Sequence, residues 1–157
     1  MKPKKNEMLF TVRYAHLKDI PLLSVGDKVM RGNFIGYQGN TGKSTGKHLH
    51  IDVVDGWKSY LYKLAEMEVD NPRANPKELN YFIDTELFGG ASFRVTTPYA
   101  DFMYTDNKGK QKLHLAYDLV GSNDKIYWNR SFIGMVLNVG NDQSYGNFVQ
   151  IGYKKDV

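Results

Sequence analysis

The feature that most constrains this chain is residues 42–53, where polar and apolar side chains alternate after a turn rich in Gly, Ser and Thr. Successive side chains of a strand point to opposite faces. The alternation therefore predicts a strand with His48, His50 and Asp52 on one face and three aliphatic side chains on the other. The apolar face requires a core, whereas a row of imidazoles has no packing purpose, so the opposite face is a candidate reactive surface.

Composition favours strands joined by tight turns. The chain has 157 residues, of which 11 are Tyr, 8 are Phe and 15 are Gly. This length is most simply one domain with a core of its own, and aromatic residues favour strands. There is no Cys, which excludes a disulfide framework and a thiolate metal site.

One helix is expected within residues 55–92, a stretch that otherwise connects the two strand-rich parts. Asn75 is suited to the N-cap, Pro76 to the first helical position and Glu78 to the third. An apolar stripe follows and ends at the pair of glycines at 89–90. The stripe comprises Leu79, Phe82, Ile83 and Leu87.

Further strands are predicted on both sides of this connector. Residues 9–17 alternate, so that His16 shares one side with apolar residues, and short strands are expected at 20–29 and 33–37. Residues 113–119 alternate again. There His114, Ala116 and Asp118 lie on one side, and Leu and Tyr side chains lie on the other.

The four histidines of the chain are the clearest indication of chemistry: His16, His48, His50 and His114. Two imidazoles and a carboxylate are good zinc ligands, and three protein ligands plus water form the open, catalytic type of site. The alternative is that each His is an ordinary surface or core residue. That alternative suits any single His better than all four together.

Other classes of function are weakly supported. Residues 36–44 resemble a phosphate-binding loop, but the position that requires Gly is Tyr37 and a strand pattern follows. The net charge of +4 is spread over scattered lysines and fits either solubility or a preference for anionic polymers. The aromatic residues follow the strand period, so we expect no nucleic-acid partner. No stretch is long and apolar enough for a membrane span.

At these residues the chain resembles the lysostaphin/LytM-like zinc murein endopeptidases. One block of that family appears at residues 14–17 (Tyr-Ala-His-Leu), 25–29 (Val-Gly-Asp-Lys-Val) and 35–50, which end in His-Leu-His. The other block appears as His114 to Leu119, with the pattern His-x-x-x-Asp, and a further match lies at 144–149.

The two blocks stand in inverted order, which resembles a circular permutation. The expectation is one permuted domain over 1–157, in which residues 1–54 correspond to the second half of the family, 55–92 form a connector with a short helix, and 93–157 correspond to the first half. Two departures from the family are Ala116 in place of Gly and Asp52 in place of Glu. The resemblance implies a mainly β, antiparallel, sandwich-like fold with an active-site groove.

Carried over residue by residue, the resemblance implies that His50, His114 and Asp118 bind one Zn²⁺ per chain and that His16 and His48 assist catalysis. It implies a zinc metalloendopeptidase that hydrolyses peptide cross-links of bacterial peptidoglycan. The alternative is a non-catalytic cell-wall-binding or phage tail structural module with the same fold.

Residues 1–10 lack the apolar core of a signal peptide. This favours a virion-associated or phage-delivered protein, with other phage tail proteins as partners, over a secreted autolysin. Two arrangements of the halves remain open: a single chain that builds its own site, and a dimer that exchanges halves.

Overall fold

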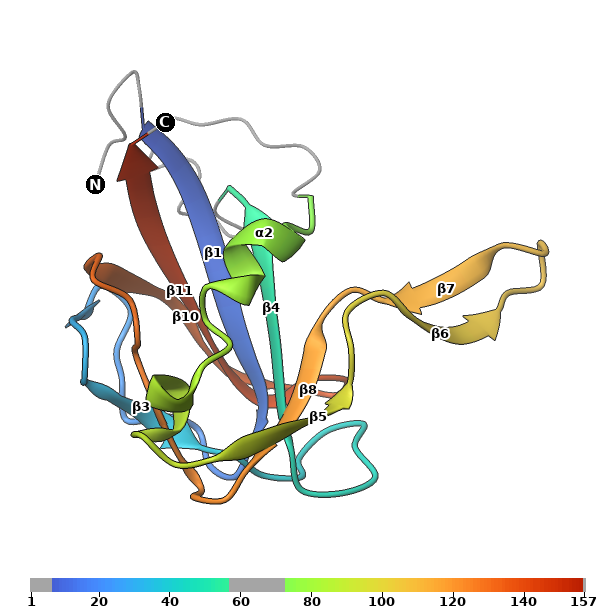
Figure 1. Cartoon of the computed structure of the whole chain (residues 1–157), viewed down its shortest axis with the longest axis horizontal. Coiled ribbons are helices and arrows are strands. Elements are labelled where there is room, and N and C mark those ends of the chain that lie inside the picture. The colour runs from blue at the N-terminus through green and yellow to red at the C-terminus, as the bar shows by residue number, and fades with distance from the viewer. Residues whose placement is uncertain (1–6, 57–72, 157) are drawn as a thin grey trace.

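In the computed structural model, which describes residues 7–56 and 73–156, a seven-stranded antiparallel sheet forms the body of the protein (Figure 1). The strand order is β2-β10-β11-β1-β4-β8-β5. The strands are β1 (Glu7–Leu17), β2 (Lys28–Val29), β4 (Leu49–Asp55), β5 (Phe93–Thr97), β8 (Tyr117–Gly121), β10 (Gly134–Asp142) and β11 (Gly146–Asp156). The expectation of a mainly β, antiparallel fold is confirmed.

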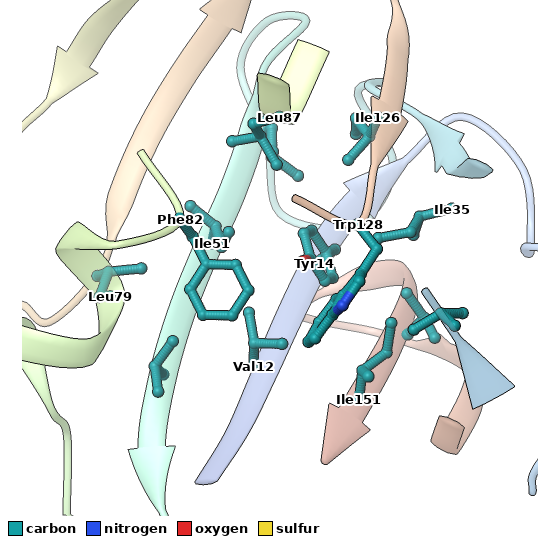
Figure 2. Packing of buried hydrophobic residues seen from close by; sticks show 14 of the residues in the cluster. Val12, Tyr14, Ile35, Ile51, Leu79, Phe82, Leu87, Ile126, Trp128 and Ile151 are labelled. Atoms are coloured by element: carbon teal, nitrogen blue, oxygen red, sulfur yellow. The ribbon is translucent and has the colours of Figure 1, made fainter. Parts of the chain in front are cut away.

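Smaller elements cover one face of this sheet and close the core. They are the helix α2 (Pro76–Asn80), the 3₁₀-helix η1 (Thr85–Phe88) and a two-stranded sheet of β3 (Phe34–Tyr37) and β9 (Lys125–Tyr127). Figure 2 shows Val12 and Ile51 of the large sheet packed near Phe82 and Trp128 of the covering layer. The packing of this layer on the sheet leaves the opposite face of β1 and β4 free for polar residues.

The strands β1 and β11, at the two ends of the chain, pair antiparallel along their length. Glu7 lies opposite Asp156, and Tyr14 lies opposite Val149. On its other side β1 pairs with β4, where Arg13 is opposite Asp52. The first and last strands of the described chain therefore lie side by side, and β1 is central in the sheet.

The connector helix begins as predicted but is broken into two short pieces. The side chain of Asn75 accepts a hydrogen bond from the Glu78 amide and caps α2, which ends at Asn80. Asp84 then caps η1, and Gly89 ends it at φ 67°. The prediction of one helix that continues to the glycines was wrong, because Asp84 acts as a second N-cap and a new helix begins after it. Residues 57–72 of the connector lie outside the described residues.

Two predicted strands also differ. Residues 20–29 form strand only at β2, because Pro21 and the turn at Gly26 interrupt the pattern. The predicted strand at 113–119 is split between β7 (Gln111–His114) and β8. With β6 (Asp101–Thr105), β7 forms a hairpin that projects from the body in Figure 1.

This hairpin changes the burial expected for the leucines before β8. Leu113 and Leu115 are 43% and 49% exposed, whereas Leu119 is fully buried. Leu113 and Leu115 therefore do not share one buried face with Leu119, since the hairpin leaves the sheet before it reaches the core. Among the described residues, no helix is long or apolar enough to span a membrane.

Candidate metal centre and flanking histidines

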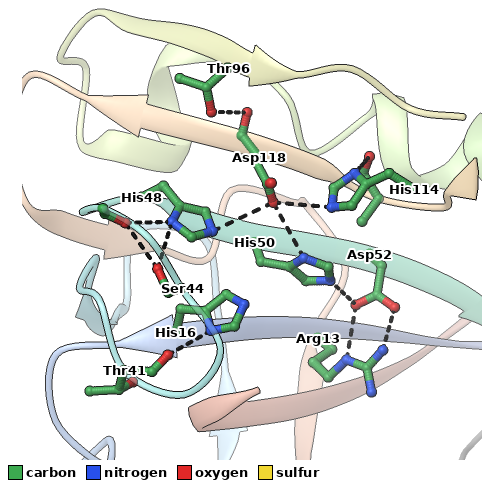
Figure 3. A network of polar contacts seen from close by, with 12 residues as sticks. Arg13, His16, Thr41, Ser44, His48, His50, Asp52, Thr96, His114 and Asp118 are labelled. Atoms are coloured by element: carbon green, nitrogen blue, oxygen red, sulfur yellow. Dashed lines mark hydrogen bonds and ion pairs between the residues drawn. The ribbon is translucent and has the colours of Figure 1, made fainter. Parts of the chain in front are cut away.

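Neighbouring strands bring three of the predicted residues to one point. His50 of β4 lies directly opposite Asp118 of β8 in the ladder, and His114 ends β7 just before β8. One ligand atom from each lies within 4.8 Å of the others, so the three could hold a metal ion. The His50 Nδ1 and the His114 Nε2 are each 3.3 Å from the Asp118 Oδ1 (Figure 3).

The Oδ1 atom of Asp118 has the environment of a metal ligand. It is buried and has no hydrogen-bond partner among the described residues, although ring nitrogens surround it. Burial alone would raise the pKa of this carboxyl, but His114 and His50 hold the pKa well below its usual range. An ionised, buried and unsatisfied oxygen beside two imidazoles fits a divalent cation.

The imidazole of His114 is anchored by the nitrogen that faces away from this point. The Nδ1 of His114 is 2.9 Å from the carbonyl oxygen of Ala116, which can only accept, so Nδ1 carries the proton and Nε2 presents its lone pair. The Asp118 carboxylate beside the ring raises the pKa of His114. A metal ion requires the neutral ring and therefore competes with the protonation of His114.

His16 reaches the site through a break in strand geometry. The alternation of β1 groups it with the core residues Val12 and Tyr14, but the ladder shifts between Tyr14 and Leu17 and His16 adopts φ 58°. This bulge turns the ring to the polar face, as bulges beside active sites often do. Its ring centroid is 5.0 Å from that of His48 and 5.6 Å from that of His50.

The loop before β4 holds the two flanking histidines. The Nδ1 of His16 is 2.6 Å from the Thr41 carbonyl oxygen, and the Nδ1 of His48 is 2.8 Å from the Gly46 carbonyl oxygen. Both rings therefore carry the proton on Nδ1. The Nε2 of His48 lies 3.7 Å from the Asp118 Oδ1. Burial lowers the pKa of His16 and favours its neutral form.

A close backbone contact fixes this loop against the turn between β10 and β11. A Cβ on Gly42 would lie 2.3 Å from the Gly146 amide nitrogen, and both glycines have positive φ. The Thr41 hydroxyl bridges the two segments, since it donates to the Leu17 carbonyl and accepts from the Asn147 amide. The glycines therefore permit the approach that orients the Thr41 carbonyl towards His16.

Three further residues at the site were not singled out as a group from the sequence. Arg13 forms a double hydrogen bond with Asp52, and its guanidinium carbon lies 3.8 Å from the centre of the Tyr145 ring. The carbonyl oxygen of Tyr145 also accepts a hydrogen bond from the His16 amide. Strand alternation put Asp52 on the histidine face, but no local signal links it to Arg13, 39 residues away.

Comparison with known proteins agrees with this class of site. Residues 4–61 match the model of peptidase family M23. A protein of Buchnera aphidicola named as an uncharacterized metalloprotease is 52% identical over 44 residues, 28% of this chain and 11% of its own length. Peptidoglycan DD-endopeptidase ShyA of Vibrio cholerae is 49% identical over 45 residues, 29% of this chain and 10% of its own length. No solved structure matches the chain significantly.

The resemblance to LytM-like endopeptidases of family M23 is thereby confirmed. The chain spans about a tenth of the length of these curated relatives. The match contains His16, His48 and His50, whereas His114 and Asp118 lie outside it and join them only through the ladder between β4 and β8. The permuted order and the association with a phage tail stay predictions.

Proposed function

We propose that this protein is a zinc metalloendopeptidase that hydrolyses peptide cross-links of bacterial peptidoglycan. The observation that carries the proposal is the convergence of His50, His114 and Asp118 on one point, with the rings of His16 and His48 beside them. The donor set of two imidazoles and one carboxylate suits zinc and leaves a fourth position open.

When bound, a zinc ion supplies Lewis acidity that polarises a carbonyl and lowers the pKa of a water molecule. The residues of the chain then handle the proton. His16 is suited to accept it, because its Nδ1–H is held by Thr41, its Nε2 is free of that bond, and burial keeps the ring neutral. After accepting a proton, His16 or His48 can donate it to the oxyanion or the leaving amine.

Peptidoglycan is proposed as substrate because ShyA, which is named as a peptidoglycan DD-endopeptidase, is 49% identical to this chain over 45 residues. The net positive charge of the chain, +4, suits an anionic cell wall.

The experiment is digestion of purified peptidoglycan by wild-type protein, by protein treated with chelator and by the His114→Ala variant. We expect new amino termini only with the metal-loaded wild type, and less than a tenth of an equivalent of zinc in the variant. A wild-type protein that carries zinc and releases no amino termini would support the alternative, a cell-wall-binding module.

A further inference from the structure

A row of polar side chains crosses three strands directly behind His50. Gln150 of β11 is opposite Arg13 of β1, and Arg13 is opposite Asp52 of β4. Residues directly opposite one another point to the same face of a sheet. Asp52 also lies two residues after His50, so that both side chains are on the face that holds the candidate metal site.

The central pair in this row is rigid and nearly dry. The Nε of Arg13 donates to the Asp52 Oδ1 at 3.0 Å, and its second nitrogen donates to Oδ2 at 2.6 Å. The two side chains are only 14% and 10% exposed, and Tyr145 covers the guanidinium. Two parallel bonds to a planar guanidinium fix both position and orientation of a carboxylate. The cavity beside the pair measures only about 10 Å³.

The carboxylate held in this way lies beside the outward nitrogen of His50. The His50 Nδ1 points to Asp118, at 3.3 Å, while its Nε2 is 3.8 Å from the Asp52 Oδ1 (Figure 3). An imidazole that offers Nδ1 to a metal must carry its proton on Nε2. Unlike His114, whose proton faces a backbone carbonyl, His50 has a side chain as its candidate acceptor.

We propose that Arg13 and Asp52 act as positioning residues, which hold His50 in the Nε2–H tautomer and in the orientation for metal binding through Nδ1. Arg13 orients the carboxylate, and the carboxylate favours the proton on the nearer ring nitrogen. This inference rests on the proposed function, because it assigns His50 to a metal. Carboxylates that orient ligand histidines typically contribute about 10–100-fold to metal affinity.

The test compares zinc affinity of Asp52→Asn, Asp52→Glu and wild type by competition with a chromophoric chelator. We expect Asp52→Asn to bind zinc about 10–100-fold more weakly. Asp52→Glu, which keeps the charge, should bind within about threefold of wild type. Asp55→Asn is the matched control, since Asp55 is on the same strand and is hydrogen-bonded to Asn75, away from the site.

A second measurement separates positioning from a structural role. In ¹⁵N-labelled, metal-free protein at alkaline pH, His50 should be the Nε2–H tautomer in wild type and Asp55→Asn, and a mixture in Asp52→Asn. Equal zinc affinity of Asp52→Asn and wild type, or an Nδ1–H tautomer in wild type, would overturn the positioning role alone. Failure of the wild type to bind zinc would overturn the proposed function as well.

Discussion

Two residues with a strained backbone flank the candidate metal centre. His16 and Ala100 are the non-glycine residues of positive φ in the described part of the chain, at 58° and 64°. Such conformations cost of order 1–3 kcal/mol each and persist where surrounding contacts hold them. The His16 amide donates to the Tyr145 carbonyl, and the Ala100 amide donates to the His114 carbonyl. His16 combines this strain with a proposed chemical role, whereas no chemical role is proposed for Ala100.

Substitution of His16 by Ala should separate chemistry from metal binding. We expect His16→Ala to retain a full equivalent of zinc but to lose about 10²–10⁴ in turnover, the range for proton transfer by a placed side chain. Metal analysis and the rate of release of amino termini measure the two quantities. Loss of zinc from this variant, with activity restored by excess metal, would move His16 into the ligand set.

Substitution of Ala100 by Gly should stabilise the protein. Glycine adopts positive φ freely, so relief of strain should exceed the added entropy of the unfolded chain by about 0.5–1 kcal/mol. Thermal unfolding of the metal-free protein measures it. The control is Ala116→Gly, at a buried alanine without positive φ, which should destabilise by a similar amount. A lower melting temperature for Ala100→Gly would contradict this account.

At the scale of elements, a buried charged cluster ties α2 to the last strand. Glu78 is 4% exposed and accepts from the Tyr153 hydroxyl at 2.8 Å and from the Lys155 ammonium at 3.0 Å. Arg130 lies 3.8 Å from the same carboxylate and over the rings of Phe82 and Phe132. The cluster joins the connector to β11 and keeps the covering layer on the sheet.

Neutralisation of Glu78 should therefore destabilise the fold. Glu78→Gln leaves the buried Arg130 without its countercharge, and we expect a loss of about 2–4 kcal/mol in the free energy of unfolding. Denaturant titration measures this. Glu86→Gln removes a comparable charge from an exposed pair with Arg31 and should cost less than about 1 kcal/mol. Equal losses for the two variants would show that the buried cluster stabilises the fold no more than an exposed ion pair does.

Because of Tyr153, which belongs to the same cluster, we expect the free energy of unfolding to fall at alkaline pH. Burial, with Glu78 beside it, raises the pKa of the Tyr153 phenol above its usual value near 10. Its contribution to stability is fully present below about pH 10 and is lost as the pH rises, because the unfolded chain releases the proton first. Tyr153→Phe should flatten the fall above about pH 10, and denaturant titration over a range of alkaline pH values measures it.

At the scale of the whole molecule, the two ends of the described chain lie next to each other. The two sequence blocks are joined by pairing between their strands. The first residue of β1 pairs with the last residue of β11, and β4 of the first block pairs with β8 of the second. Exposed, adjacent ends are where permutation is tolerated. The predicted permutation is thus compatible with a complete site in one chain.

If the predicted permutation holds, joining the two present ends and opening new ones in the connector should leave the fold unchanged. A Gly/Ser linker from Val157 to Met1, both outside the described residues, with new ends after Gly90, should give a protein that binds one zinc. Gly90 is a suitable cut because a Cβ there would meet nothing within 4 Å. Zinc content and circular dichroism measure the outcome, and an unfolded product would contradict the permuted arrangement.

A complementation experiment tests the competing arrangement with exchanged halves. We expect no activity when His50→Ala and His114→Ala proteins are unfolded and refolded together, because one chain supplies all three ligands. Recovery of activity would instead mean that each site takes ligands from two chains.

Sequence by itself determined the features that depend on neighbours along the chain. The alternation around His50 predicted β4 and its two faces, and Asn75 with Pro76 predicted the start of α2. These predictions succeed because strand period and helix capping are local properties of the backbone. The grouping of His50 with His114 and Asp118 as ligands was implied by the resemblance to LytM-like endopeptidases and did not follow from spacing along the chain.

Tertiary structure decided what depends on contacts distant in sequence. His16 shares the core side of β1 by alternation and reaches the polar face only because contacts with Thr41 and Tyr145 hold a bulge. Arg13 finds Asp52 through strand pairing, and Leu113 is exposed because its hairpin leaves the sheet. Local periodicity cannot encode these outcomes, because each depends on the free energy of contacts between segments that only the folded chain brings together.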